Sequence, residues 1–221
     1  MKKAIICFTR VPRPGQTKTR LLPLLRPEQC VELHLAFLRD LSSVYEQINA
    51  DLFVAYTPDP DPSVLQEIFP KSRSFFPQQG NDLGEKMFHA IEQVLKQGYD
   101  ACILTGSDLP LMKAEHLNSG FSALENADVT LGPTSDGGYY LVGMKKPCPE
   151  VFSKQEYGCS TVWNNTLAAV EKAGYSFAPA LTCDDVDTPD DLKKLWTIIQ
   201  DTSSHSAKFL DLLWKDGVSL C

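Results

Sequence analysis

The sequence lacks the features that mark several large classes of protein. No apolar run is long enough to span a bilayer, and the seven scattered cysteines contain no C-x-x-C pair, which argues against a membrane helix, a zinc knuckle or a dithiol redox motif. The 21 basic residues are outnumbered by 28 acidic ones, and the net charge of −7 argues against a nucleic-acid or membrane surface. The first apolar run is too short for a signal peptide. We therefore expect a cytoplasmic protein whose partners include no nucleic acid polymer and no membrane.

Positive charge is concentrated in one place. Residues 1–27 contain seven basic side chains and no acidic one. In "CFTRVPRPGQTKTRLLP", Arg10, Lys18 and Arg20 follow the first apolar run, while Gly15 and the prolines restrict the loop. The spacing is not that of a Walker A motif, but such side chains beside a glycine turn suit phosphate oxygens. The stretch predicts a phosphate-binding loop, with a solvated basic loop as the alternative.

Short apolar runs alternate with helical patterns along most of the chain. The expected strands are residues 2–8, 51–56, 72–77, 100–106, 128–133, 137–144 and 175–180, and the expected helices are residues 27–48, 63–69, 81–98, 114–125, 160–173 and a segment from 189 onward. This alternation predicts an α/β fold, a Rossmann-like three-layer sandwich with a mostly parallel, mixed sheet. We expect one domain over residues 1–200 and a helical tail over residues 201–221 that packs on it.

Ligands bind such sheets beyond the carboxyl ends of the strands, and the basic loop is one of three unusual stretches there. In the second, "TGSDLPLM", Asp108 directly follows an apolar strand and Pro110 keeps Leu109 out of the helical region. A carboxylate held in this way suits Mg²⁺, which prefers hard oxygen ligands. The alternative for Asp108 is an ordinary turn-forming role.

The third stretch is the acidic run "CDDVDTPDD". Thr188 as N-cap, Pro189 in the first turn and the two aspartates that follow are explained by the start of a helix. Asp184, Asp185 and Asp187 remain unexplained, because adjacent carboxylates repel one another unless a cation faces them. We therefore expect Asp187 to be a second metal ligand, with Asp185 as a neighbour.

The stretch "GPTSDGGYYLVG" predicts a hairpin, because D-G-G favours a tight turn between two strands. Its glycines would also let a substrate approach the backbone closely. No Ser-His-Asp or Cys-His arrangement is recognisable. The four histidines show no ligand spacing, so we expect them to be structural.

Five motifs occur in an order that resembles a known bacterial family: "FTRVPRPGQTKTRL", "GNDLGEKM", "GSDLPLM", "GPTSDGGYYLVGM" and "DVDTPDDL". That family is the nucleotide-diphospho-sugar transferases of glycosyltransferase-A-like (GT-A) fold. Its wider superfamily includes the guanylyltransferases of molybdenum-cofactor and phospholactate pathways. The resemblance covers about residues 4–195 and implies a nucleotide held at the loop after the first strand.

The resemblance also implies roles for single positions. The nucleotide-binding residues would be Arg10, Gly15, Lys18, Thr19, Arg20, Asn81, Leu83 and Gly84. The catalytic residues would be Lys18, Arg20 and Asp108, and the ligands of Mg²⁺ or Mn²⁺ would be Asp108 and Asp187. The acceptor would be bordered by Asp136, Gly137, Gly138 and Tyr139.

Two positions depart from the family pattern. Sugar transferases of this fold usually carry D-x-D at the metal position, whereas this chain has Gly106-Ser107-Asp108, which is closer to the nucleotidyltransferases. A tryptophan that is common in the family near "EYGCST" is replaced by Tyr157. An aromatic platform is kept, but its contacts would differ.

We expect a transferase that depends on Mg²⁺ or Mn²⁺ and uses a nucleotide-activated substrate with a small-molecule acceptor. The family resemblance favours glycosyl transfer from a nucleotide sugar. The first alternative is nucleotidyl transfer from a nucleoside triphosphate to a phosphorylated acceptor, and the second is a nucleotide-binding protein without catalysis. In both reactions, metal and cations would neutralise charge on the phosphates.

Asp108 and Asp187 are 79 positions apart, yet the ends of the strands should bring them together opposite Lys18 and Arg20. Repulsion between the carboxylates predicts that Asp108→Asn stabilises the metal-free protein. Because Lys18 and Arg20 lie on a loop, replacing either should change stability by no more than about 0.5 kcal/mol.

Overall fold

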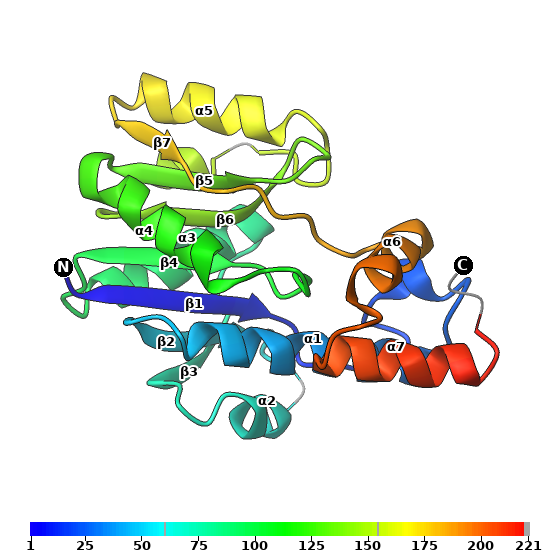
Figure 1. The fold of residues 1–221 in the computed structure, drawn as a ribbon. Helices are drawn as coiled ribbons and strands as arrows, with labels where there is room; N and C mark the ends of the chain where they lie inside the picture. Colours follow the sequence, from blue (N-terminus) through cyan, green and yellow to red (C-terminus); the bar gives the residue numbers. More distant parts are fainter. Residues whose placement is uncertain (60, 154, 219–221) are drawn as a thin grey trace.

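The computed structural model describes residues 1–59, 61–153 and 155–218. It contains a seven-stranded sheet with the order β3-β2-β1-β4-β6-β5-β7 (Figure 1). The strands are β1 (Lys3–Thr9), β2 (Asp51–Tyr56), β3 (Ser74–Pro77), β4 (Ala101–Thr105), β5 (Val129–Pro133), β6 (Tyr139–Met144) and β7 (Phe177–Pro179). β6 is antiparallel to both neighbours, and the other pairs are parallel. The expected mostly parallel, mixed sheet is confirmed.

Helices cover both faces of this sheet (Figure 1). They are α1 (Pro27–Tyr45), α2 (Ser63–Ile68), α3 (Leu83–Leu95), α4 (Ala114–Asn126), α5 (Val162–Lys172), α6 (Pro189–Ile199) and α7 (His205–Lys215), with short 3-10 helices η1 (Thr19–Leu21) and η2 (Pro149–Val151). Helices α1, α2 and α4 pack on one face, and α3 and α5 on the other, which confirms the three layers. Within the described residues, no helix combines the length and the apolar character needed to cross a membrane.

The order of the strands determines where a ligand can bind. From β1 the chain moves outward through β2 and β3, and then returns to place β4 on the other side of β1. The strand order therefore reverses between β1 and β4, and open sheets of this kind bind ligands at the carboxyl ends of such a pair. The basic loop follows β1 and Asp108 follows β4, so these two stretches meet at that point.

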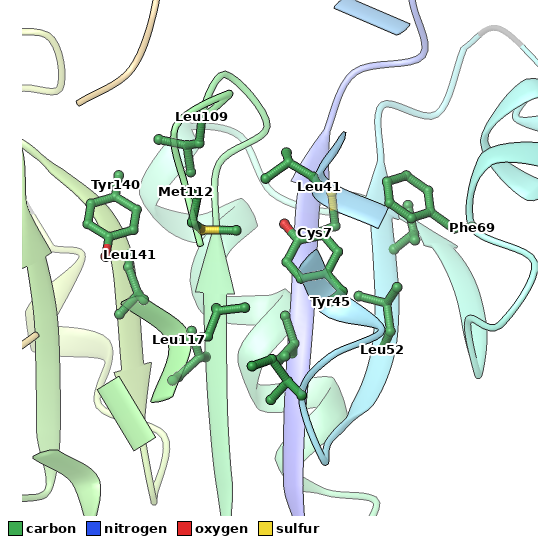
Figure 2. Close-up of a cluster of buried hydrophobic side chains, with 14 of the residues drawn as sticks. Cys7, Leu41, Tyr45, Leu52, Phe69, Leu109, Met112, Leu117, Tyr140 and Leu141 are labelled. Carbon is green, nitrogen blue, oxygen red and sulfur yellow. The ribbon is translucent and has the colours of Figure 1, made fainter. Parts of the chain in front are cut away.

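The loop after β4 is held in place by the core under α1, α2 and α4. Figure 2 shows Leu109 and Met112 of this loop among the buried side chains of the cluster, together with Tyr45 of α1. The hydroxyl of Tyr45 forms a 2.7 Å hydrogen bond with that of Thr105, the last residue of β4. The backbone is therefore packed on both sides of Asp108, which restricts where its carboxylate can lie.

A second cluster of apolar side chains, here called the tail core, lies beyond the carboxyl ends of the strands. It joins the basic loop and α1 to α6 and α7, and α7 runs beside α1 (Figure 1). Its buried members are Leu21, Leu25, Cys30, Leu33, Phe37, Val186, Leu192, Leu195, Trp196, Ile199, Ala207, Leu210 and Leu213. Because Leu21 follows Lys18 by three residues and Val186 precedes Asp187, the tail core supports both charged segments.

The first turn of α7 is also tied to α1 by hydrogen bonds. The carboxylate of Asp40 accepts hydrogen bonds from the backbone N–H groups of His205 (2.7 Å) and Ser206 (2.9 Å), and from the Ser206 hydroxyl. A side chain from another helix thereby satisfies donors that a helix start leaves free. The tail packs on the domain through residue 218, and residues 219–221 of the expected tail lie outside the described residues.

We expect Leu210→Ala to lower the free energy of unfolding by about 2–5 kcal/mol, because it removes a fully buried side chain from the tail core. The matched control is Leu212→Ala in the same helix, where the side chain is 58% exposed and the change should stay within about 0.5 kcal/mol. Urea denaturation followed by circular dichroism measures both. Equal effects of the two substitutions would contradict a packed tail core.

Candidate active site

A cavity of about 730 Å³ opens at the carboxyl ends of β1 and β4. Its walls come from the basic loop, the loop after β4, the first turns of α3, the start of β6 and the acidic segment around Asp187. Small-molecule sites usually measure about 300–1,000 Å³, so this cavity has room for a nucleotide. All three unusual stretches of the sequence contribute to it.

Lys18 occupies the turn that carries the basic loop into η1. Its φ of 51° makes it the one non-glycine residue with a left-handed backbone in the described part of the chain. Such a conformation is uncommon and clusters at functional sites. The side chain is only 3% exposed. Its Nζ lies 2.7 Å from Oδ1 of Asp108 and 3.2 Å from Oδ1 of Asp187, and it donates a hydrogen bond to the carbonyl of Val186.

Asp108 is held by two groups from different elements. Besides the Lys18 ammonium, the imidazole Nδ1 of His34 on α1 lies 3.3 Å from the same Oδ1. The other ring nitrogen of His34, Nε2, is paired at 3.2 Å with the hydroxyl of Thr9 at the end of β1. Burial alone would raise the pKa of Asp108, but Lys18 and His34 outweigh it and hold this pKa well below its usual range. Asp108 is therefore a carboxylate at any physiological pH.

Asp187 lies between a buried cation and an exposed one. Its Oδ1 faces Lys18, and its Oδ2 lies 3.2 Å from the guanidinium of Arg20, a side chain that is 69% exposed. Arg10, also exposed, lines the cavity at the end of β1. The structure therefore brings Asp108, Asp187, Lys18 and Arg20 together, as expected. The acids and the bases are in direct contact, however, instead of facing one another across a gap.

A third carboxylate, that of Asp185, lines the cavity with Asp108 and Asp187. Burial, together with the nearby charges of Asp187 and Asp136, raises the pKa of Asp185 to about 6. Hard carboxylate oxygens are ligands that Mg²⁺ prefers. No group of three or more histidine, cysteine or acidic side chains that could hold a metal by themselves occurs in residues 1–59, 61–153 and 155–218.

The cavity wall contains part of the predicted set of site residues. The predicted residues that line it are Arg10, Lys18, Thr19, Arg20, Leu83, Asp108, Tyr139 and Asp187. The predicted residues outside the wall are Gly15, Asn81, Gly84, Asp136, Gly137 and Gly138. For most of this second group, the structure shows another reason for the residue type.

Packing explains two of these glycines. A Cβ on Gly84 would lie 2.6 Å from the carbonyl oxygen of Phe152, and one on Gly137 would lie 2.3 Å from that of Ser160. Gly137 also has a φ of +90°, which favours glycine in any case. Both glycines therefore permit the close approach of protein backbone, where the sequence suggested the approach of a substrate.

Local hydrogen bonds explain the polar residues outside the wall. Asn81 donates to the carboxylate of Glu85 through its backbone N–H (2.8 Å) and its side-chain amide (3.0 Å). Asp136 accepts a 3.0 Å hydrogen bond from the backbone N–H of Gly138, which closes the predicted hairpin turn. Asp136 still acts on the site at a distance, through its effect on the pKa of Asp185.

Several cavity residues were not singled out from the sequence. His34 was expected to be structural, but the structure places it against Asp108. Gln78 lines the cavity and donates to the carbonyls of Thr9 (2.9 Å) and Ala55 (3.1 Å), which ties the ends of β1 and β2 together. Lys86 lines the cavity from the first turns of α3. His34 and Gln78 lie outside the five motifs, whereas Lys86 lies within "GNDLGEKM".

Two tyrosines form a wall of the cavity away from the carboxylates. The hydroxyls of Tyr139 and Tyr157 are hydrogen-bonded at 3.3 Å, and their rings meet edge to face with centroids 6.4 Å apart. Burial raises the pKa of Tyr157 to about 12, so its hydroxyl remains a proton donor at neutral pH. The expected aromatic platform is present, with Tyr157 in the place of the tryptophan.

Comparisons with known proteins agree with this architecture. The family described as "Uncharacterized protein conserved in bacteria (DUF2064)" matches residues 40–159. The crystal structure of a "putative nucleotide-diphospho-sugar transferase" from Desulfovibrio desulfuricans G20 is 31% identical, with a TM-score of 0.89 over 97% of this chain and 96% of that one.

Two curated relatives are more distant in sequence. A phosphoenolpyruvate guanylyltransferase from Sphaerobacter thermophilus is 24% identical, and the match covers 86% of this chain and 91% of that protein. A 2-phospho-L-lactate guanylyltransferase from Methanothermobacter thermautotrophicus is 25% identical, with 90% of this chain and 86% of that protein covered.

We expect Asp108→Asn to lower the free energy of unfolding in EDTA at neutral pH by about 1–3 kcal/mol, because the buried Lys18 ammonium loses one of its two carboxylates. This reverses the expectation from the sequence, since the ammonium already offsets the repulsion between Asp108 and Asp187. Urea denaturation measures the effect, with Asp201→Asn on the surface as the neutral control. A gain in stability for Asp108→Asn would show that repulsion still dominates.

Asp185→Asn should have the opposite effect. Since the pKa of Asp185 is raised in the folded protein, its ionisation opposes folding. The resulting decrease in the free energy of unfolding is absent below the usual pKa of about 4. It grows until about pH 6 and is constant above that. In EDTA, Asp185→Asn should therefore stabilise the protein by about 1–3 kcal/mol at pH 7.5 and progressively less toward pH 4.5. A stability difference that does not change with pH would contradict this assignment.

Proposed function

The chain belongs to the DUF2064 family of bacterial proteins, and we propose that it is a nucleotidyltransferase that joins a nucleoside triphosphate to a phosphorylated small-molecule acceptor. The chain is a transferase of the nucleotidyl- or glycosyl-transferring kind. One observation favours nucleotidyl transfer over glycosyl transfer. The carboxylate that joins Asp108 is Asp187, from a distant segment, and not an acid two positions earlier as in D-x-D.

The position of the missing acid supports this choice. Gly106 stands where sugar transferases carry the first aspartate of D-x-D, and the space where its side chain would lie is open. Steric crowding therefore does not explain the absence of an acid there. The names of both curated relatives specify guanylyl transfer to a phosphorylated compound, which agrees with nucleotidyl transfer.

In the proposed reaction, an oxygen of the acceptor phosphate attacks the α-phosphorus of the triphosphate. The bond between the α-phosphorus and the bridging oxygen breaks, and pyrophosphate leaves. The protein's task is mainly to orient the phosphates and neutralise their charge. The exposed guanidinium groups of Arg20 and Arg10 are placed to bind phosphate oxygens at the cavity wall. Leu83, 43% exposed at the start of α3, offers an apolar surface to the base.

Asp108 and Asp187 would hold Mg²⁺ or Mn²⁺ in this reaction, with Asp185 beside them. The hard oxygens of these carboxylates suit a divalent cation. A cation bound there supplies charge neutralisation on the phosphates and on the leaving pyrophosphate. The six cysteines within the described residues are free thiols, which supports the proposal that the protein works in the cytoplasm.

Glycosyl transfer from a nucleotide sugar is the second candidate. It is favoured by the Desulfovibrio desulfuricans structure, whose description names nucleotide-diphospho-sugar transfer and whose fold matches this one closely. The two reactions differ in their leaving groups. Nucleotidyl transfer releases pyrophosphate, whereas glycosyl transfer releases a nucleoside diphosphate.

The experiment incubates the protein with each nucleoside triphosphate, Mg²⁺ and a panel of phosphorylated acceptors, and measures pyrophosphate by a coupled assay. We expect pyrophosphate with at least one pair and a loss of about 100-fold or more in Asp108→Asn. Thermal shift on the same panel gives an independent measure of binding, since a ligand at a hundred times its dissociation constant adds about 2.7 kcal/mol of stability.

A parallel assay with nucleotide sugars measures release of nucleoside diphosphate. That product without pyrophosphate would replace the proposal with glycosyl transfer. Thermal stabilisation by nucleotides without either product would instead favour a nucleotide-binding protein that has lost catalysis.

A further inference from the structure

The ammonium of Lys18 is surrounded by oxygen atoms of the protein itself. It hydrogen-bonds to the carbonyl of Val186 and to Oδ1 of Asp187 at 3.2 Å, and Oδ1 of Asp108 lies at 2.7 Å. An ammonium group has three N–H donors, and two of them are used in these hydrogen bonds, while the charge is also paired with Asp108. The ring of Phe37 lies with its centroid 5.3 Å from Nζ. Most of the hydrogen-bonding capacity of Lys18 is therefore used within the protein.

Lys18 lines the cavity, but its side chain is far less accessible than that of Asp108. Its side chain is 3% exposed, whereas that of Asp108 is 37% exposed. Within Asp108, Oδ1 is fully buried, so the exposure belongs to the rest of the carboxylate. Lys18 and His34 both contact the buried oxygen. The ammonium is therefore less accessible to a ligand than the carboxylate, and Oδ2 is the oxygen of Asp108 that remains available to the cavity.

We infer that Lys18 is a positioning residue, which assembles Asp108 and Asp187 into a pair that can bind a divalent cation, and that Arg20 provides the phosphate contact of the loop. This inference rests on the proposed function for the identity of the ligands. It gives Lys18 and Arg20 different roles, whereas the sequence suggested that both bind phosphate.

The construction of the loop supports a fixed position for Lys18. Its left-handed backbone is followed directly by η1, whose Leu21 is fully buried in the tail core. Val186, the source of the bonding carbonyl, is buried in the same core. Packing thus fixes both the backbone of Lys18 and the Val186 carbonyl that accepts its hydrogen bond. Arg20 has no such support, since its side chain is 69% exposed.

The test compares Lys18→Met with Arg20→Met, which remove two cations that contact the same carboxylate of Asp187. Binding of Mn²⁺ alone is followed by electron paramagnetic resonance. Binding of GTP and of inorganic triphosphate is followed by calorimetry in EDTA. We expect Lys18→Met to weaken Mn²⁺ binding by about tenfold or more, as the loss of groups that orient metal ligands usually does. Its metal-free affinity for the anions should stay within about twofold of wild type, because no phosphate contact is lost.

Arg20→Met should show the reverse pattern. Its metal-free affinity for the anions should fall by about tenfold, as expected for a lost charged hydrogen bond. Its Mn²⁺ affinity should change by less than about threefold, because the ion pair with Asp187 is exposed. Weaker anion binding in Lys18→Met, tighter Mn²⁺ binding in Lys18→Met, or no Mn²⁺ binding by the wild type would each overturn the inference.

Lysine methylation of the wild-type protein tests the inference without a variant, should Lys18→Met fail to fold. Formaldehyde and a borane reductant modify accessible lysines, and mass spectrometry locates the label. We expect Lys18 to be modified far more slowly than Lys71, whose side chain is 73% exposed, both with and without inorganic triphosphate. A Lys18 that reacts in the free protein and is protected only by the triphosphate would be a phosphate ligand.

The Mn²⁺ and methylation results do not depend on which reaction is catalysed. If the proposed function fails, no pyrophosphate forms with any substrate pair, while the contrast between Lys18→Met and Arg20→Met in Mn²⁺ affinity remains. If the inference fails, wild-type activity remains and that contrast is absent. The two failures are therefore distinguishable.

Discussion

The contact of one ammonium with two carboxylates determines how the functional end of this protein is arranged. Lys18 reaches Asp108, which β4 delivers, and Asp187, which the segment before α6 delivers. An ammonium as buried as that of Lys18 is stable only if it is paired with opposite charge and its hydrogen bonds are met. The two carboxylates pair with it, the carbonyl of Val186 accepts one of its hydrogen bonds, and Nδ1 of His34 lies 3.3 Å from the buried oxygen of Asp108. These contacts can form only if the basic loop, the end of β4 and the segment before α6 all lie close together.

Much of the fold could be predicted from the sequence, because its helices and strands have strong local signals. Thr188 and the aspartates after Pro189 predicted the start of α6, where Thr188 and Asp191 indeed cap the first turn reciprocally. The D-G-G turn predicted the antiparallel pair β5 and β6. The order of the strands had no such signal. It depends on which apolar faces pack together across the whole domain, and that order creates the reversal between β1 and β4.

In the site too, some residues have a local sequence signal and others do not. Asp187 stood out because the start of a helix did not explain it, and Asp108 because it directly follows an apolar strand. His34 was missed because a single histidine in a helix carries no local sign of its partner, and Asp108 is 74 residues away. The packing roles of Gly84 and Gly137 were missed for a related reason. The carbonyls that they approach come from later segments of the chain. The sequence alone therefore could not show that protein packing requires a glycine at these positions.

The tail core has a consequence for the order in which the protein can be completed during synthesis. The loop that carries Lys18 leaves the ribosome long before Leu210, which packs in the same core. Folding of a nascent chain proceeds as its segments become available. The sheet can form while the chain is still growing, whereas the packing beneath the basic loop must wait for α7. A nascent chain that has not yet released α7 would therefore carry the residues of the site without the complete core that supports them.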